Sequence, residues 1–150
     1  MIAGIDYSTH AVDVVLLDED TDAATWHRYE LGGQDAFERA RMVREAVRDS
    51  WAYWDDVLAI GIEDPRGYNA GALYRIQGAL LAAIPATTLV HPLPPSVWRK
   101  TVGLPGNASK RDVAEFVMDA VPPEMDAPWP QDACDAYCIA LATRTLLVTA

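Results

Sequence analysis

Residues 1–17 read MIAGIDYSTHAVDVVLL, two runs rich in Ile and Val separated by the turn-compatible residues 7–10. Short β-branched runs joined by polar turn residues are typical of a β-hairpin. Residues 25–31 alternate in the same way and predict a third strand. The chain is therefore expected to open with three antiparallel strands.

Helices and strands alternate through the rest of the chain. Apolar residues recur every three or four positions over 37–51, which predicts an amphipathic helix. The apolar run 57–62 ends at Glu63, the pattern of a buried parallel strand. Further elements are expected over 69–84 (helix), 87–90 (strand), 97–102 (short helix), from a cap near Asn107 or Ser109 (helix), and over 132–147 (helix). This order predicts an α/β fold with a mixed five-stranded sheet, three antiparallel strands first and parallel strands after, flanked by helices.

The length and composition favour one globular unit. A chain of 150 residues, half of them hydrophobic, can bury one core and is too short for two ordinary domains. Its apolar runs are shorter than the roughly 18 residues of a membrane span, and its N-terminus lacks the pattern of a signal peptide. We expect a single domain over residues 1–150, in the cytoplasm and away from membranes. Cys134 and Cys138 are expected to be reduced core residues, because a disulfide between helical positions four apart is awkward.

The charge of the chain is unevenly distributed. A net charge of −10 argues against a protein that holds nucleic acid over its whole surface, since affinity for phosphate comes largely from Lys and Arg. Between His91 and Arg111, however, there is no acidic residue. This local basic strip could guide a phosphate backbone while the rest of the surface stays acidic. Its cations are Arg99, Lys100, Lys110 and Arg111.

Four acidic residues occur at the ends of predicted elements. Asp6 ends the first strand, Glu63 ends the fourth, and Asp132 and Asp135 share one face at the start of the last helix. If the first and fourth strands are neighbours, these carboxylates meet at one edge of the sheet and repel strongly unless cations neutralise them. Oxygen ligands of this kind suit Mg²⁺ or Mn²⁺. Two such ions about 4 Å apart could activate water and stabilise the leaving oxygen of a phosphodiester.

Structural explanations for these acids stay open. An Asp after a strand is often a turn former, and acids at a helix start complement its dipole. Asp64 should point to the face opposite Glu63 and is the weaker candidate. Asp13 and Asp18 are expected to face solvent.

Four segments resemble, in order, the successive motifs of the RuvC-like Holliday junction resolvases. They are IAGID (2–6), AIGIE (59–63), KTVG (100–103) followed by Gly106 and Lys110, and DACDA (132–136). The resemblance spans nearly the whole chain. It implies a ribonuclease H-like fold, a homodimer, and nicking of paired strands at four-way DNA junctions during recombination, repair or genome processing. It also implies Mg²⁺ as the cofactor, with Mn²⁺ as a substitute.

The resemblance also assigns roles to residues. It implies that Asp6, Glu63, Asp132 and Asp135 are the catalytic metal ligands. Lys110 would lie near the scissile phosphate, and Lys100 would contact DNA. Tyr68 could stack on an opened base or be an ordinary half-buried aromatic residue, and the helix over 69–84 would build much of the dimer contact. The chain is shorter and more acidic than the usual cellular members, which suits a compact phage-type member in a bacterial or phage-infected cell, with a relaxed preference among branched DNAs.

Two other functions compete with this interpretation. GIDYST (4–9) also resembles the first phosphate loop of sugar kinases and actin-like ATPases, but 150 residues leave no room for their second lobe. A catalytically silent DNA- or protein-binding module could keep the same fold. The complete set of four acids with Lys110 argues against that module, because a silent member is expected to lose at least one of them.

Overall fold

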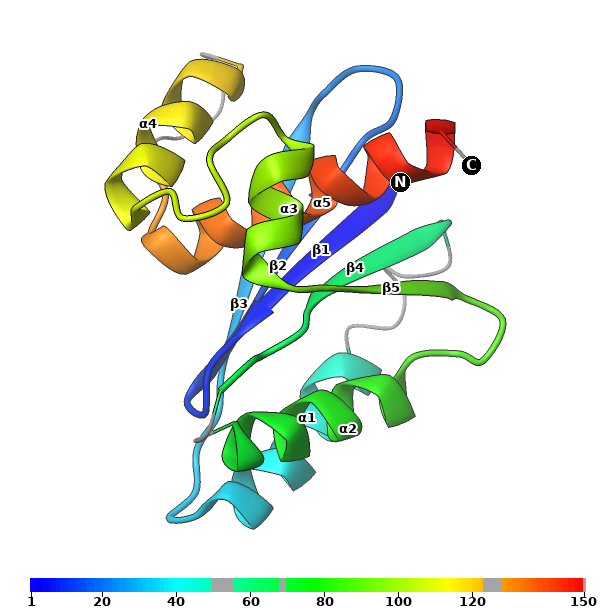
Figure 1. Cartoon of the computed structure of the whole chain (residues 1–150). Coiled ribbons are helices and arrows are strands. Elements are labelled where there is room, and N and C mark those ends of the chain that lie inside the picture. The colour runs from blue at the N-terminus through cyan, green and yellow to red at the C-terminus, as the bar shows by residue number, and fades with distance from the viewer. Residues whose placement is uncertain (50–55, 68–69, 123–127, 150) are drawn as a thin grey trace.

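The computed structural model describes residues 1–49, 56–67, 70–122 and 128–149 (Figure 1). Its five-stranded sheet has the order β3-β2-β1-β4-β5. Neighbouring pairs among β1, β2 and β3 are antiparallel, whereas β4 is parallel to β1 and β5 to β4. The predicted mixed sheet, antiparallel first and parallel after, is confirmed. The strands are β1 (Ile2–Tyr7), β2 (Ala11–Leu17), β3 (Ala24–Glu30), β4 (Ala59–Glu63) and β5 (Leu89–Leu93).

Helices cover both faces of this sheet. In Figure 1, α1 and α2 lie together on one side, and α3, α4 and α5 lie on the other. The longest helix, α5, packs across β1, β2 and β4. The helices are α1 (Ala36–Asp49), α2 (Gly71–Ala83), α3 (Pro95–Thr101), α4 (Lys110–Ala120) and α5 (Gln131–Thr149).

The alternation of side chains along β1 divides the core into two layers. Ile5 packs toward α1 and α2, among buried residues that include Val43 and Leu80. Ile2 packs toward α5, in a layer that includes Ile139. Because successive strand residues point to opposite faces, Asp6 lies on the α5 side.

Two glycines bring α5 unusually close to the sheet. A Cβ atom added at Gly4 would lie 2.0 Å from the carbonyl oxygen of Ala136, and one at Gly61 would lie 2.0 Å from Oγ1 of Thr143. Only glycine fits at such an approach. The glycines of β1 and β4 therefore fix where α5 lies, and with it the acids at its start.

Several predicted boundaries were wrong by two or more residues. The fifth strand was predicted to end before Pro92, but β5 continues through that proline to Leu93. Since β5 is an edge strand, the missing N–H of Pro92 need not break a ladder. The short helix α3 begins at Pro95, ahead of the predicted position, because proline fits the first helical turn. By contrast, the cap predicted near Ser109 is confirmed as a capping box with Asp112.

The two cysteines are free and buried, as predicted. Burial raises the pKa of each thiol, so both stay protonated at neutral pH. No helix in the described ranges is long and apolar enough to span a membrane.

Candidate metal centre

The parallel pairing of β1 with β4 brings Asp6 and Glu63 to the same edge of the sheet. Ile5 pairs with Ile62, so the acids that follow them lie side by side near the ends of neighbouring strands. Ile5 and Ile62 pack toward α1 and α2, which turns Asp6 and Glu63 to the α5 face. The predicted juxtaposition of these two acids is confirmed.

The start of α5 adds Asp132 and Asp135 to this edge. Asp6 and Asp135 are buried, whereas the side chain of Asp132 is 39% exposed. The pKa of Asp6 is raised well above its ordinary range by burial and by the negative charges of Glu63, Asp135 and Asp132. The four predicted acids therefore lie close enough for their charges to interact, and we call them the acidic cluster.

Three of these acids accept a hydrogen bond from a side chain. Trp98 Nε1 donates to Glu63 Oε2 at 3.2 Å, and Gln131 Nε2 donates to Asp135 Oδ1 at 2.9 Å. Arg28 Nη1 donates to Asp132 Oδ2 at 3.4 Å. Within the described ranges, no three Asp, Glu, His or Cys side chains converge on a common point that could hold a metal ion. An ion would therefore have to draw the carboxylates of the cluster closer together.

Burial raises the pKa of Glu63 and of Asp135. Their hydrogen bonds from Trp98 and Gln131 oppose that rise, as do the nearby cations Arg99 and Lys110. Buried carboxylates repel one another when they are ionised at neutral pH. A group of them is therefore a suitable donor set for hard divalent cations, which neutralise their charge.

The basic strip contributes two cations to this edge. Arg99 and Lys110 both interact with Glu63 and Asp135 through their charges. The guanidinium of Arg99 lies 4.8 Å from the centre of the Trp98 ring, and its buried Nε has no hydrogen-bond partner in the described part of the chain. Arg99 therefore lies near the acidic cluster with an N–H donor that no described residue uses.

The other two cations of the strip make local contacts. The side chain of Lys100 packs over Gly106, where an added Cβ would lie 2.8 Å from Lys100 Cε. Arg111 is 83% exposed and pairs with Glu115 at 2.7 Å. The sequence predicted both Arg99 and Lys100 as DNA contacts, and of the two the structure places Arg99 near the acids.

The backbone of Glu63 is held from two sides. The hydroxyl of Tyr7 and Nε2 of Gln77 both donate to the Glu63 carbonyl, at 3.0 and 3.2 Å. Tyr74 donates to the Pro65 carbonyl at 2.8 Å. Sequence reasoning missed these donors, as it missed Trp98 and Gln131, because they meet the acids only in the folded chain.

The remaining candidates have different outcomes. Asp13 was predicted to face solvent, which is wrong: it is 1% exposed and is hydrogen-bonded by Trp26 and Arg28. Asp64 is half-buried and pairs with Arg66 at 3.6 Å. Asp18 is half-buried and accepts from the backbone of the following turn. Tyr68 lies outside the described residues.

Replacing Asp6 with Asn should stabilise the metal-free protein at neutral pH. Because the folded chain keeps protons that the unfolded chain releases, the cluster's contribution to the free energy of unfolding is highest below about pH 4. It falls as pH rises through the raised pKa values of Asp6, Glu63 and Asp135. Thermal unfolding in a chelator should show the variant melting higher at pH 7, by about 2–4 °C per kcal/mol of repulsion removed, and no higher below pH 4.

Asp64→Asn provides the matched control, because it removes a neighbouring carboxylate outside the cluster. It should not raise the melting temperature at pH 7. Equal stabilisation by both substitutions would show that the effect reflects the overall charge of −10 rather than the cluster.

Comparisons with known proteins agree with this architecture. No protein-family model and no curated protein sequence matches the chain. Among solved structures, Thermus thermophilus RuvC aligns with a TM-score of 0.78 at 22% identity, over 99% of this chain and 95% of that chain. The same protein in complex with a Holliday junction substrate aligns with a TM-score of 0.80 at 20% identity, over 99% and 94%. The yeast mitochondrial Holliday junction resolvase Ydc2 aligns with a TM-score of 0.64 at 13% identity, over 98% and 78%.

These likenesses extend over essentially the whole chain. The sequence identities are low, so the agreement concerns the backbone architecture. The chain has the RuvC-like form of the ribonuclease H-like fold, as its sequence motifs had indicated.

Proposed function

We propose that residues 1–150 form a single nuclease domain, a divalent-metal-dependent endonuclease that nicks branched DNA and above all four-way junctions. The acidic cluster carries the proposal, because four interacting carboxylates lie at one edge of a RuvC-like fold. Arg99 and Lys110 beside them provide the charge that a phosphate backbone needs. A protein of this fold is described in complex with a Holliday junction, which supports the choice of substrate.

The carboxylates of Asp6, Glu63, Asp132 and Asp135 would hold Mg²⁺, or Mn²⁺ in its place. When bound, such ions activate a water molecule for attack and stabilise the leaving oxygen of the phosphodiester. Arg99 and Lys110 would offset the negative charge that develops on the phosphate, in a site already partly shielded from water. Lys100 and Arg111 would contact DNA farther from the reacting atoms, and Tyr68 would also contact DNA.

We also propose a homodimer formed through α2. The side chains of Tyr74 and Leu81 on this helix are 49% and 44% exposed, which leaves an apolar surface without cover in one chain. A two-fold dimer would present two equivalent sites to the two equivalent strands of a four-way junction. Gln77 on the same helix donates to the Glu63 carbonyl, so the dimer surface and the acidic cluster would be joined through one helix.

Cleavage of matched four-way junction, flap and linear duplex DNA in Mg²⁺ and in Mn²⁺ tests the proposal. Paired nicks confined to the junction would establish a resolvase. Cutting of flaps as well would keep the metal chemistry and widen the substrate class to branched DNA in general.

A catalytically silent DNA- or protein-binding module is the alternative. It is favoured by one observation, that the described carboxylates do not converge on a common point. Junction binding without strand cleavage in either metal would support it.

Lys110→Ala should slow cleavage by about 100-fold, the effect typical of removing one charge-stabilising donor from a reacting site. Arg111→Ala is the matched control. Arg111 is the cation next to Lys110, and it pairs with Glu115 and not with the acidic cluster. We expect Arg111→Ala to lower DNA affinity modestly while single-turnover cleavage at saturating enzyme stays near normal. If the two variants were slowed equally, Lys110 would have no special place at the scissile phosphate.

A further inference from the structure

A row of charged residues crosses the sheet at the level of the acidic cluster. Asp13 on β2 pairs with Asp6 on β1 and, on its other side, with Arg28 on β3. In this register the three side chains point to the same face, the one that α5 covers. Arg28 therefore ends a row that begins with two adjacent carboxylates.

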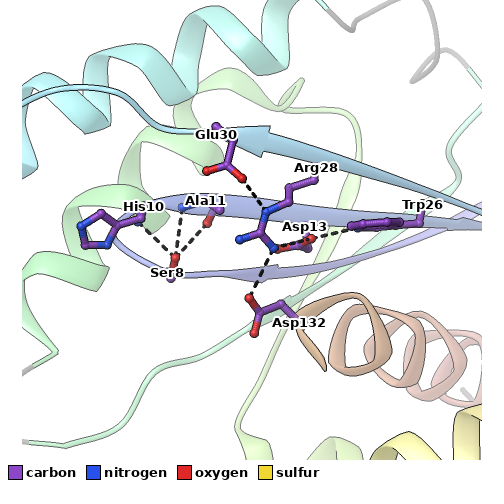
Figure 2. Close-up of polar contacts among 8 residues, drawn as sticks. All are labelled: Ser8, His10, Ala11, Asp13, Trp26, Arg28, Glu30 and Asp132. Carbon is purple, nitrogen blue, oxygen red and sulfur yellow. Dashed lines mark hydrogen bonds and ion pairs between the residues drawn. The ribbon is translucent and has the colours of Figure 1, made fainter. Parts of the chain in front are cut away.

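Asp13 anchors Arg28 in place (Figure 2). It accepts a hydrogen bond from Trp26 Nε1 at 2.8 Å and two from Arg28 Nη1, at 2.9 and 3.2 Å. With its side chain 1% exposed, this carboxylate has no access to water to replace those partners. A buried carboxylate of this kind needs its cation, which makes the Asp13–Arg28 pair a fixed part of the sheet.

From this anchor, Arg28 reaches α5. Nη1 donates to Asp132 Oδ2 at 3.4 Å, while Nε donates to the exposed Glu30 at 2.8 Å. Figure 2 shows the guanidinium between the strands and the first turn of α5, with Asp132 approaching it from the helix. This contact joins the third strand to the acidic cluster.

We infer that Arg28, fixed by an Asp13 carboxylate that Trp26 also holds, is a positioning residue that holds the Asp132 carboxylate at the metal site. The inference rests on the proposed function, since it concerns a ligand of the proposed metal. The planar guanidinium suits this task because its donors point in fixed directions toward several acceptors at once. Partners that orient metal ligands in this way often set metal affinity.

Mn²⁺ binding to the DNA-free protein, measured by titration calorimetry, tests the inference without relying on activity. Arg28→Lys keeps the positive charge beside Asp13 but loses the fork that reaches Asp132. The Kd for Mn²⁺ should rise about 10-fold. In an Asp132→Asn background the same substitution should change the Kd by less than about twofold, because its effect passes through Asp132.

Glu30→Gln is the control, since it removes the third partner of Arg28 and leaves Asp13 and Asp132 untouched. It should bind Mn²⁺ like the wild type. If Arg28→Lys lowers the melting temperature below the range of the titration, Trp26→Phe offers a second variant. It removes the indole donor from Asp13 and should weaken Mn²⁺ binding in the same direction, again only when Asp132 is present.

Three results would overturn the inference. Unchanged or tighter Mn²⁺ binding by Arg28→Lys would show that Arg28 is idle or competes with the metal. An equal effect with and without Asp132 would show a general structural role. No Mn²⁺ binding by the wild type would overturn the proposed function itself, which separates the two failures.

Discussion

Asp135→Asn should reduce cleavage of a four-way junction by more than about 100-fold. Loss of a residue that only hydrogen-bonds a metal ligand usually reduces activity by about 10- to 100-fold, and loss of a ligand itself should reduce it further. The substitution preserves shape, and the Gln131 side chain can still donate to the amide oxygen. It removes one negative charge from a buried position that interacts with Asp6. Single-turnover cleavage in Mg²⁺ measures the loss.

Junction binding should survive the same substitution. Removing a carboxylate near the path of a phosphate backbone lowers repulsion, so affinity in a metal-free buffer should be equal or slightly higher. Asp119→Asn on α4 removes the same charge from an exposed site and should cut normally. Near-normal cleavage by Asp135→Asn would remove this residue from the proposed metal ligands. Loss of binding along with cleavage would point to misfolding of α5.

The placement of the four acids could be predicted because each stands at the end of a regular element. The apolar runs of β1 and β4 each lead into an acid at or next to the end of the strand: Asp6 is followed by one more residue of β1, and Glu63 is the last residue of β4. Parallel pairing of β1 with β4 then brings the two acids together. The spacing of Asp132 and Asp135 on a helix supplies the rest.

The choice between Arg99 and Lys100 could not be made from the sequence. Neighbouring residues on a helix point about 100° apart, so the answer depends on how α3 is rotated. That rotation follows from the burial of Trp98, whose indole reaches Glu63. The basic strip in the sequence predicts only that cations lie near the acidic cluster, and not which of them faces it.

Asp13 was misjudged because its environment depends on strand register. A charged residue in the middle of β2 is ordinarily expected on a solvated face. Here Arg28 lies directly opposite on β3, and Trp26 donates from two residues earlier on that strand. Periodicity along one strand does not predict which residues pair across strands. The contact of Arg28 with Asp132 could not be predicted either, because it joins residues far apart in the sequence.

Gly4→Ala should destabilise the fold by more than about 3 kcal/mol, the upper part of the range for overpacking a core. The added Cβ would lie 2.0 Å from the Ala136 carbonyl oxygen and 2.5 Å from the Ala140 amide nitrogen. Both are backbone atoms, so no rotamer change relieves the clash and α5 must shift. Thermal unfolding by circular dichroism should show a fall of roughly 6–12 °C or more.

Gly78→Ala is the control, since an added Cβ at Gly78 in α2 meets no atom of the described chain within 4 Å outside its own turn of helix. Alanine inside a helix is favoured over glycine by about 0.5–1 kcal/mol, so this variant should melt slightly higher than the wild type. A melting temperature for Gly4→Ala within about 2 °C of the wild type would show that α5 can move away from β1 at little cost. In that case the acids at its start would not be fixed by the sheet, and rigid placement of Asp132 and Asp135 would have to come from Arg28 and Gln131 instead.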